Sequence, residues 1–252
     1  MHVGFRALMR REVVRVTKLW TQTIIAPVVS SALFILVFGL SLGDRIREID
    51  GFPYDQYIVP GLIAMSMAQA AYANNSSSVF QASFDRYIND VLASPMRGWE
   101  VNLGLNLGGA VRALLIGGGL VAVVLPFVDV PVREPVTLAA AIGLALVLFS
   151  SFGVIVGIYA NSWDHTAFVT NIVILPLSFL GGVFYSVDVL PSPWQELSHL
   201  NPIFYLLNAV RYGFLGTSDV PVGIALGVTA AFALACVVWS AAMFRSGRRL
   251  KA

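Results

Sequence analysis

The chain has 252 residues, of which 57% are hydrophobic and only 12% are charged. Soluble domains carry about 25% charged residues, so this composition excludes an ordinary soluble domain and indicates an integral membrane protein. The formal net charge is +2, and no pattern of basic and aromatic residues suggests a nucleic-acid partner.

Residues 1–18 predict an amphipathic helix that lies along the inner membrane surface. Its apolar positions recur at helical spacing, and its arginines occupy another face. The alternative interpretation is a basic flank that only fixes the topology of the chain. The apolar positions are Met9, Val13, Val16 and Trp20, and the arginines are Arg6, Arg10 and Arg11.

Six apolar stretches follow, and each predicts a transmembrane helix, because roughly 20 apolar residues cross the hydrocarbon core. The third is free of charge only from Ala113 to Val128, so it crosses only if it extends back through Arg112. The sequence therefore predicts an all-α integral membrane protein with a single transmembrane domain, residues 1–252. The predicted spans are 19–43, 56–81, 101–128, 135–160, 166–187 and 220–244.

Uncharged polar residues gather in the second predicted span. Hydrogen-bonding groups of this kind favour a protein interior or a hydrated path over lipid. They are therefore candidates for a substrate path, and hydrogen bonding between helices is an equally open alternative. The candidate path residues in this span are Tyr72, Asn74, Asn75 and Ser78.

Arg112 is the only ionised residue within a predicted span. A guanidinium group in the membrane is costly unless it is paired, hydrated or close to the interface. We expect Arg112 to line the path, bind a headgroup or brace a neighbouring helix, and satisfaction by helix carbonyls or water is the alternative. Glycines around it predict close helix packing; they are Gly104, Gly108, Gly109, Gly117, Gly118 and Gly119.

Residues 83–95 predict a short amphipathic helix on the cytoplasmic side, and Pro95 marks its end. A helix resting on lipid is one interpretation, but acidic side chains are unfavourable beside an anionic leaflet. A protein partner fits better. The apolar positions are Phe84, Ile88, Val91 and Leu92, and the polar positions are Asp85, Arg86, Asn89 and Asp90.

Basic residues cluster before the first span and after the last one, which predicts that both termini are cytoplasmic. With six spans, the three external connections then carry nine acidic and four basic residues. This asymmetry agrees with the predicted orientation. The positive charge at the inner face suits anionic lipid headgroups.

Residues 188–216 form the last external connection in this topology. Prolines interrupt it, and its apolar run is too short to cross a membrane. Such a run can enter the membrane and return if protein covers its backbone. The sequence therefore predicts an external re-entrant segment.

The sequence contains no motif that supports a catalytic role for this chain. The only lysines are Lys18 and Lys251, and neither follows a glycine, so a phosphate-binding loop of the G-x-x-x-x-G-K-[ST] type is excluded. The three histidines offer no close pairing for a metal, and no G-x-S-x-G elbow is present. We expect neither catalytic residues nor metal ligands in this chain.

Several stretches together resemble bacterial ABC-2 type permeases. They include "REVVRVTKLWTQTIIAPVVSSALFILVFGLSLG", "YDQYIVPGLIAMSMAQAAYANNSSSVFQ", "VLASPMRGWE" and the segment from Gly181 to Gly216, in the same order as in that family. The resemblance covers nearly the whole chain. Each stretch alone is weak, and their combination is specific.

The resemblance implies a six-span permease in a bacterial inner membrane that pairs with a second copy and with two ATP-binding subunits. ATP and Mg would bind to those partners, and this chain would carry no cofactor. It implies export of an amphiphile such as a lipid, drug or glycoconjugate. By the same resemblance, Phe84, Asp85, Arg86, Ile88, Asn89 and Leu92 would couple to the ATPase, and Phe204, Tyr205, Leu206 and Leu207 would form an external gate.

Two other classes of protein remain open from the residues. One is an intramembrane enzyme that modifies lipid, and the other is a stand-alone channel or secondary transporter. Five of the predicted spans lack ionisable side chains, so their surfaces suit an amphiphile better than a small ion. Co-purification with an ATPase distinguishes an ATP-driven permease from both alternatives.

Overall fold

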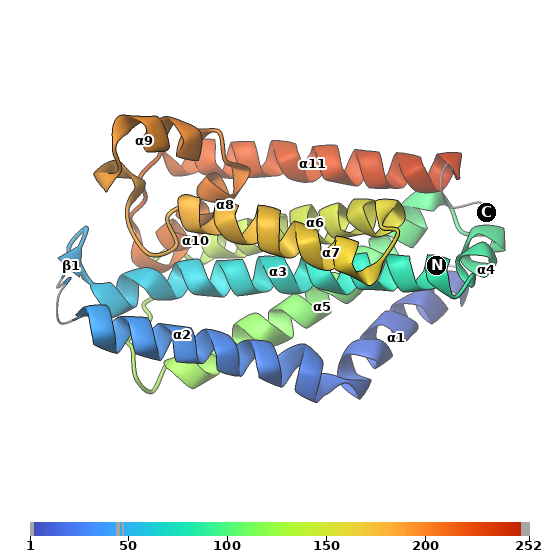
Figure 1. Cartoon of the computed structure of the whole chain (residues 1–252), viewed down its shortest axis with the longest axis horizontal. Coiled ribbons are helices and arrows are strands. Elements are labelled where there is room, and N and C mark those ends of the chain that lie inside the picture. The colour runs from blue at the N-terminus through green and yellow to red at the C-terminus, as the bar shows by residue number, and fades with distance from the viewer. Residues whose placement is uncertain (1–2, 44–45, 47, 248–252) are drawn as a thin grey trace.

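The computed structural model describes residues 3–43, 46 and 48–247 and is almost entirely helical (Figure 1). Two-residue strands β1 (Glu48–Ile49) and β2 (Phe52–Pro53) form a small antiparallel pair. The helical elements are α1 (Val3–Lys18), η1 (Thr21–Ile25), α2 (Ala26–Gly43), α3 (Tyr54–Phe84), α4 (Ile88–Ala93), α5 (Gly98–Val124), α6 (Pro135–Tyr159), α7 (Trp163–Val169), η2 (Thr170–Ile174), α8 (Leu175–Leu180), η3 (Val187–Val189), α9 (Ser192–His199), α10 (Pro202–Leu215) and α11 (Val222–Ser246).

Helix α3 lies at the centre of the bundle and contacts α2, α5, α6 and α10. Most of its residues are buried, including its asparagines and several serines. Small side chains such as Ala68 and Ala71 let the neighbouring helices approach closely. The polar stripe predicted for the second span therefore faces protein along much of its length.

Four helical segments of the described chain are long and apolar enough to cross a membrane. They are Thr21–Gly39, Gly98–Val124, Pro135–Tyr159 and Val222–Ser246. Helix α3 is long enough, but its amide and hydroxyl side chains lower its hydropathy. The chain from Trp163 to Leu180 is divided among α7, η2 and α8. An all-α membrane protein fits these helices, and the six-span layout stays a prediction.

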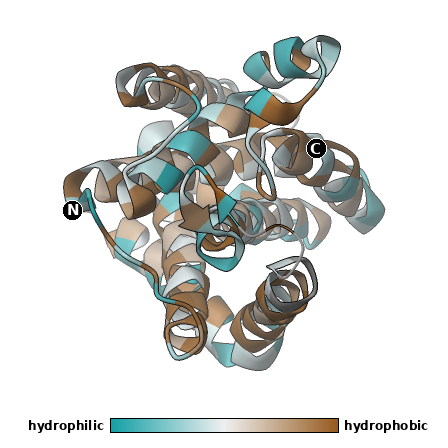
Figure 2. Ribbon diagram, turned by 90° about the vertical axis from the view of Figure 1, so that its left-hand side faces the viewer, coloured by the Kyte–Doolittle hydropathy of each residue, from teal (hydrophilic) through white to brown (hydrophobic). Residues whose placement is uncertain are grey.

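Exposed apolar side chains cover the outer faces of α2, α5 and α11. Figure 2 looks at the bundle from the end that carries α9 and β1, and hydrophobic residues occur in helices all around it. A surface of this kind is unfavourable in water and suits contact with lipid tails. Examples are Leu33, Phe34, Leu114, Leu115, Leu234 and Val238.

The two ends of the bundle carry different elements (Figure 1). The N-terminal part of α1, the C-terminal end of α11 and the short helix α4 lie at one end. The β1–β2 pair and α9 lie at the other end. Both described termini and the segment around α4 therefore share one side of the molecule.

The helical chain of the fifth predicted span ends earlier than expected. It stops at Leu180, whereas the sequence predicts a span to residue 187. Gly181 and Gly182 follow, and Gly182 has a φ of +84°, a left-handed conformation that glycine adopts most readily. The apolar character of residues 183–187 reflects burial in the fold, since Val183 and Val187 are almost inaccessible.

Five of the six predicted packing glycines lie at close helix contacts, and Gly119 is one of them, since its added Cβ would lie 3.2 Å from Val28 Cγ2 of α2. A Cβ atom on Gly104 would lie 2.8 Å from Leu8 Cδ2, and one on Gly108 would lie 2.5 Å from Glu12 Cβ. Gly109 and Gly117 likewise face α3 and its partners. Gly118 faces open space and has no such role. The close approach of α1 to α5 thus depends on glycines in α5.

Gly213 marks the point where α10 crosses the start of α6. A Cβ there would lie 2.6–2.9 Å from the Cβ, Cα and N atoms of Leu138, and two of these are backbone atoms that cannot rotate away. We expect Gly213→Ala to lower the free energy of unfolding by about 1–3 kcal/mol through overpacking. Thermal unfolding of the purified protein measures this. Gly227→Ala is the matched control, because nothing lies within 4 Å of its added Cβ, and equal stability of the two variants would contradict the crossing.

Candidate functional site

The polar residues of α3 connect three helices inside the protein. Asn75 Nδ2 donates to Asn106 Oδ1 of α5 at 3.3 Å and to the Ser150 carbonyl of α6 at 3.0 Å. Tyr72 Oη donates to the Thr166 carbonyl at 3.0 Å. Both side chains are fully buried. For Tyr72 and Asn75, the structure therefore shows the alternative that the sequence left open, which is hydrogen bonding between helices.

Glu12 of α1 is fully buried and forms a charged cluster. Its Oε1 accepts hydrogen bonds from Ser78 Oγ of α3 at 2.7 Å and from Arg11 Nη2 at 2.7 Å. Its Oε2 accepts one from Arg15 Nη2 at 3.0 Å. Charge-assisted hydrogen bonds of this kind are stronger than neutral ones. The cluster fixes α1 against the polar stripe of α3.

The sequence analysis does not identify Glu12 as a site residue. The available signal is that Glu12 is the only acidic residue in residues 1–18 and that Arg15 follows it by three positions. The face of α1 that packs on the bundle is also rotated from the predicted apolar stripe. Of that stripe, Val16 alone is buried. The buried face consists of Phe5, Leu8, Glu12 and Val16.

A cavity of about 590 Å³ lies between α1, α3 and α5, and we call it the basic cavity. Three arginines line it: Arg11, Arg15 and Arg112. Tyr87 also lines it, and the Arg11 guanidinium carbon lies 5.1 Å from the centre of its ring. Burial raises the pKa of the Tyr87 hydroxyl, against an opposing effect of Arg11, so this group is protonated at neutral pH and can donate.

Arg112 lines a second, smaller cavity of about 240 Å³ as well. Its wall includes Ser31 and Ser66, whose hydroxyl oxygens lie 2.8 Å apart, and Gln69. The Nε2 atom of Gln69 is buried and has no hydrogen-bond partner among the described residues. Arg112 thus lines both the basic cavity and a smaller polar pocket between α2, α3 and α5.

The structure brings together only some of the predicted path residues. Asn74 and Arg112 both line the basic cavity. Ser78 contacts the same region through Glu12. Tyr72 and Asn75 line neither of these two cavities and hold helices together instead. Asn74 and Arg112 are therefore the predicted path residues that face a cavity, and the path itself stays a prediction.

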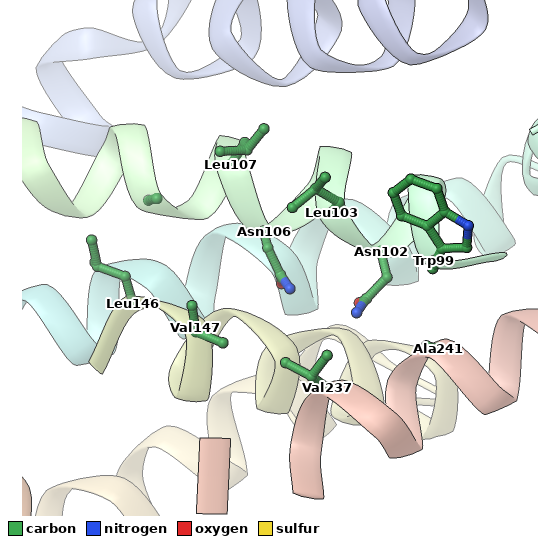
Figure 3. Close-up of a pocket in the computed structure, with 10 residues that line it drawn as sticks. Trp99, Asn102, Leu103, Asn106, Leu107, Leu146, Val147, Val237 and Ala241 are labelled. Atoms are coloured by element: carbon green, nitrogen blue, oxygen red, sulfur yellow. The ribbon is translucent and has the colours of Figure 1, made fainter. Parts of the chain in front are cut away.

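A third hollow lies on the opposite face of α5 and is mainly apolar. Figure 3 shows Asn102 and Asn106 pointing from α5 toward α6 and α11, with Trp99 at one end. The hollow has a volume of about 320 Å³, and Leu103, Leu107 and Val147 form much of its wall. Asn106 is engaged by Asn75 and by Ser151. This hollow has no charged lining residue.

The segment around α4 differs from the single helix predicted for residues 83–95. Helix α3 continues to Phe84, a turn covers residues 85–87, and α4 contains only Ile88–Ala93. Arg86 has a φ of 62°, which reverses the chain between the two helices. Asp85, Arg86 and Asn89 are exposed. The polar residues predicted for coupling therefore lie on the outside at the end of the bundle.

The apolar coupling residues divide into two groups. Phe84 is 69% exposed. Ile88 is only 6% exposed and packs in a core cluster with Val101 and Ile155. Leu92 is partly buried against the same cluster. Only Phe84 is free to enter a partner protein without a change in the fold.

The predicted external gate residues lie in α10. Asn201 caps this helix, since its side chain accepts a hydrogen bond from the Ile203 amide, and Gly216 ends it in the left-handed conformation. Phe204, Leu206 and Leu207 are fully buried. Tyr205 is half-buried, and its hydroxyl donates to the His199 carbonyl at 2.8 Å. Three of the four predicted gate residues are therefore buried in the core.

Arg211 of α10 is fully buried, and the sequence analysis does not predict this. Its guanidinium carbon lies 4.1 Å from the centre of the Tyr57 ring, and its Nη2 donates to the Gly182 carbonyl. Its Nη1 lies 3.9 Å from Asp219 Oδ2. Asp219 also accepts hydrogen bonds from Ser186 Oγ and the Val187 amide. This cluster ties α10 to α3 and to the loop after α8.

Comparison with known proteins shows the family of this chain. The family model described as "ABC-2 type transporter" matches residues 3–215. The chain belongs to the ABC-2 type transporter family. It is 41% identical to the inner membrane transport permease YadH of Escherichia coli (strain K12) over 251 residues, which cover 99% of this chain and 97% of the relative.

More distant relatives are similar along nearly the same length. Nodulation protein J of Rhizobium meliloti (strain 1021) is 26% identical over 248 residues, which cover 97% of this chain and 93% of the relative. Nodulation protein J of Rhizobium leguminosarum bv. viciae is also 26% identical, over 98% of this chain. The chain is therefore an ABC-2 transport permease by family.

The Glu12 cluster gives a test of how α1 is held. We expect Glu12→Ala to lower the free energy of unfolding by about 2 kcal/mol, because it removes the acceptor for Ser78 and for two arginines. Glu12→Gln keeps one acceptor oxygen and should lose less. Thermal unfolding of the purified variants measures both effects. Glu196→Ala, at an exposed position of α9, is a control, and equal losses for Glu12→Ala and Glu196→Ala would contradict the role of the cluster.

Proposed function

We propose that this chain is the membrane permease of an ATP-driven exporter. Two copies form the translocation path, and two separate ATP-binding subunits supply the energy. ATP and Mg bind to those subunits, and the permease itself carries out no chemistry. Alternating access is the mechanism, because ATP-driven closure of the partners favours one of two arrangements of the permeases.

The observation that carries this proposal is the exposed turn between α3 and α4. Phe84 is the exposed last residue of α3, next to α4 at the same end of the bundle as the described termini, and the exposed charged residues Asp85 and Arg86 follow it. An exposed aromatic side chain beside charged groups is typical of a hot spot in a protein interface. Helix α3 leads directly from this turn into the polar centre of the permease, so movement of the turn would reach the cavities around Arg112.

The finer layout belongs to the same proposal. Six spans would cross a bacterial inner membrane, with the termini and α4 on the cytoplasmic side and α9 and α10 toward the outside. The similarity to a transport permease of the inner membrane supports the location. In this layout α10 is the re-entrant segment, and its buried residues Leu206 and Leu207 shield the outer end of the path.

The substrate class that fits best is an amphiphile. Apart from Arg11, Arg15 and Arg112, the two central cavities offer mainly hydroxyl, amide and aliphatic groups to a ligand. The apolar surface of the bundle gives a lipid-like molecule access from the side. A small inorganic cation fits poorly, since neither cavity is lined by an acidic side chain.

The test is ATP hydrolysis by the assembled complex. The tagged chain is purified in mild detergent with its co-expressed ATP-binding subunit, and ATPase activity is measured for the complex and for each part alone. We expect activity in the complex and in the ATP-binding subunit, and none in the permease alone. Hydrolysis by the isolated permease, or failure of any ATP-binding protein to associate with it, would overturn the proposal.

A further inference from the structure

The basic cavity carries more positive charge than its own carboxylate can neutralise. Arg11, Arg15 and Arg112 line it. In the described part of the chain, Glu12 is the only carboxylate that pairs with any of these three arginines, and it pairs with Arg11 and Arg15. Three guanidinium groups and one carboxylate leave a surplus of two positive charges beside a membrane-facing surface.

Some arginine hydrogen-bond donors at the basic cavity also lack an acceptor among the described residues. The Nε atom of Arg15 is buried and has no hydrogen-bond partner among the described residues. Arg112 is bonded through Nε to the Thr23 carbonyl at 3.3 Å, a long hydrogen bond that leaves its terminal nitrogens free for another acceptor. Arginine is well suited to phosphate, because its planar group donates two parallel hydrogen bonds.

The rim of the basic cavity is apolar. Val14 and Leu19 line it, and each is 48% exposed. Trp20 follows directly and is 55% exposed. Tryptophan favours the boundary between lipid tails and headgroups. Positive charge inside and apolar side chains at the rim complement a molecule with a charged head and an apolar tail.

We propose that the basic cavity binds the phosphate group of an anionic lipid-like amphiphile. Arg112 and Arg15 receive the phosphate, the neutral groups of Ser77 and Tyr87 add polar contacts, and the tail lies against Val14 and Leu19. This site goes beyond the proposed transport function and does not depend on it. A resident membrane lipid and a transported substrate would satisfy the same chemistry.

The test is direct lipid binding by the full-length chain purified in detergent. Native mass spectrometry counts bound dioleoyl phosphatidate, with dioleoyl phosphatidylcholine as the zwitterionic comparison. We expect wild-type protein to prefer phosphatidate, R112Q to bind it about tenfold more weakly, and R112K to bind with an affinity between the two, because lysine keeps the charge but cannot donate two parallel hydrogen bonds. R10Q is the matched control, since Arg10 is an exposed arginine of α1 that does not line the cavity. We expect its affinity to be unchanged.

Three results would overturn the site. The first is wild-type protein without a preference for phosphatidate. The second is an equal loss of binding in R112Q and R10Q, which would indicate general attraction to positive charge. The third is displacement of phosphatidate by inorganic phosphate at equal concentration, which would leave a site for a free anion and not for an amphiphile.

A labelling experiment on the wild-type protein covers the case in which R112Q does not fold. A photoreactive phosphatidate is crosslinked to the full-length chain, and the modified peptides are identified by mass spectrometry. We expect modification to concentrate on the lining residues of α1, α3 and α5. Labelling spread evenly over the lipid-facing helices would contradict the proposal.

Discussion

Phe84→Asp is expected to detach the ATP-binding subunit while the permease stays folded and inserted in the membrane. The side chain is 69% exposed, and its ring centre lies 6.0 Å from that of Phe80. Removing an aromatic hot spot costs about 2–4 kcal/mol of binding, which is about 30- to 700-fold in affinity. Pull-down of the ATP-binding subunit and ATP-dependent transport measure the loss.

The matched control is Phe127→Asp. Phe127 is similarly exposed, at 66%, but it follows α5 at the opposite end of the bundle from α4. This control separates loss of the partner from the general effect of a new surface carboxylate. If both variants retained the partner and transported at the normal rate, the turn after α3 would be a lipid-facing feature.

Ile88 is left unchanged in this experiment because of its position. The sequence places Phe84 and Ile88 on one apolar face, and an aspartate at each position would at first look like the stronger test. Ile88 is buried in the core cluster around Val101, so an aspartate there would also unfold that region. Phe84 alone gives a variant whose loss of function has one cause.

Arg211→Met is expected to destabilise the protein by about 3 kcal/mol. The methionine fills similar space, but it leaves the buried Asp219 without its cationic partner, and breaking a buried ion pair from one side typically costs about 3–5 kcal/mol. The lower figure is expected, because Asp219 keeps its hydrogen bonds to Ser186 and Val187. Thermal unfolding of the purified protein measures the change.

Two further variants make this result specific. In the double variant Arg211→Met with Asp219→Asn, both charges are gone, so part of the lost stability should return. Arg133→Met removes an exposed arginine near the same end, which contacts the Phe52 ring at 5.0 Å, and should change stability by less than about 1 kcal/mol. A double variant less stable than Arg211→Met would show that the two charges do not act as a pair.

The positions of the long apolar helices follow from hydropathy alone. Helix α6 occupies Pro135–Tyr159 where the sequence predicts a span at 135–160, and α11 occupies Val222–Ser246 against a predicted 220–244. Runs without charge have a single stable arrangement in lipid, because each backbone amide must be bonded within its own helix. Local pattern is therefore sufficient for these elements.

Buried charges could not be predicted in the same way. Arg211 lies in a segment that the sequence assigns to the outside, and its partners Gly182, Tyr57 and Asp219 come from three other parts of the chain. Glu12 lies on a helix that the sequence predicts to lie along the membrane surface. In both cases the neutralising contacts are tertiary, and periodicity within one helix contains no information about them.

The candidate site was also predictable in its residue types and not in its tertiary contacts. The sequence predicts a polar stripe in α3 and singles out Arg112, and the structure places Asn74 and Arg112 in the wall of the basic cavity. The sequence does not predict that Arg15 lines this cavity. It also does not predict that the Asn75 side chain is hydrogen-bonded to α5 and α6. Residue type identified the polar groups, and the helix contacts decide which of them remain free for a ligand.

The central claim is that this chain works as a permease coupled to separate ATP-binding subunits. The most direct test is the mass of the intact complex purified through a tag on this chain and measured by native mass spectrometry. The account predicts two copies of the 27.2 kDa permease together with two ATP-binding subunits. A permease that is purified in active form without any ATP-binding subunit would contradict it.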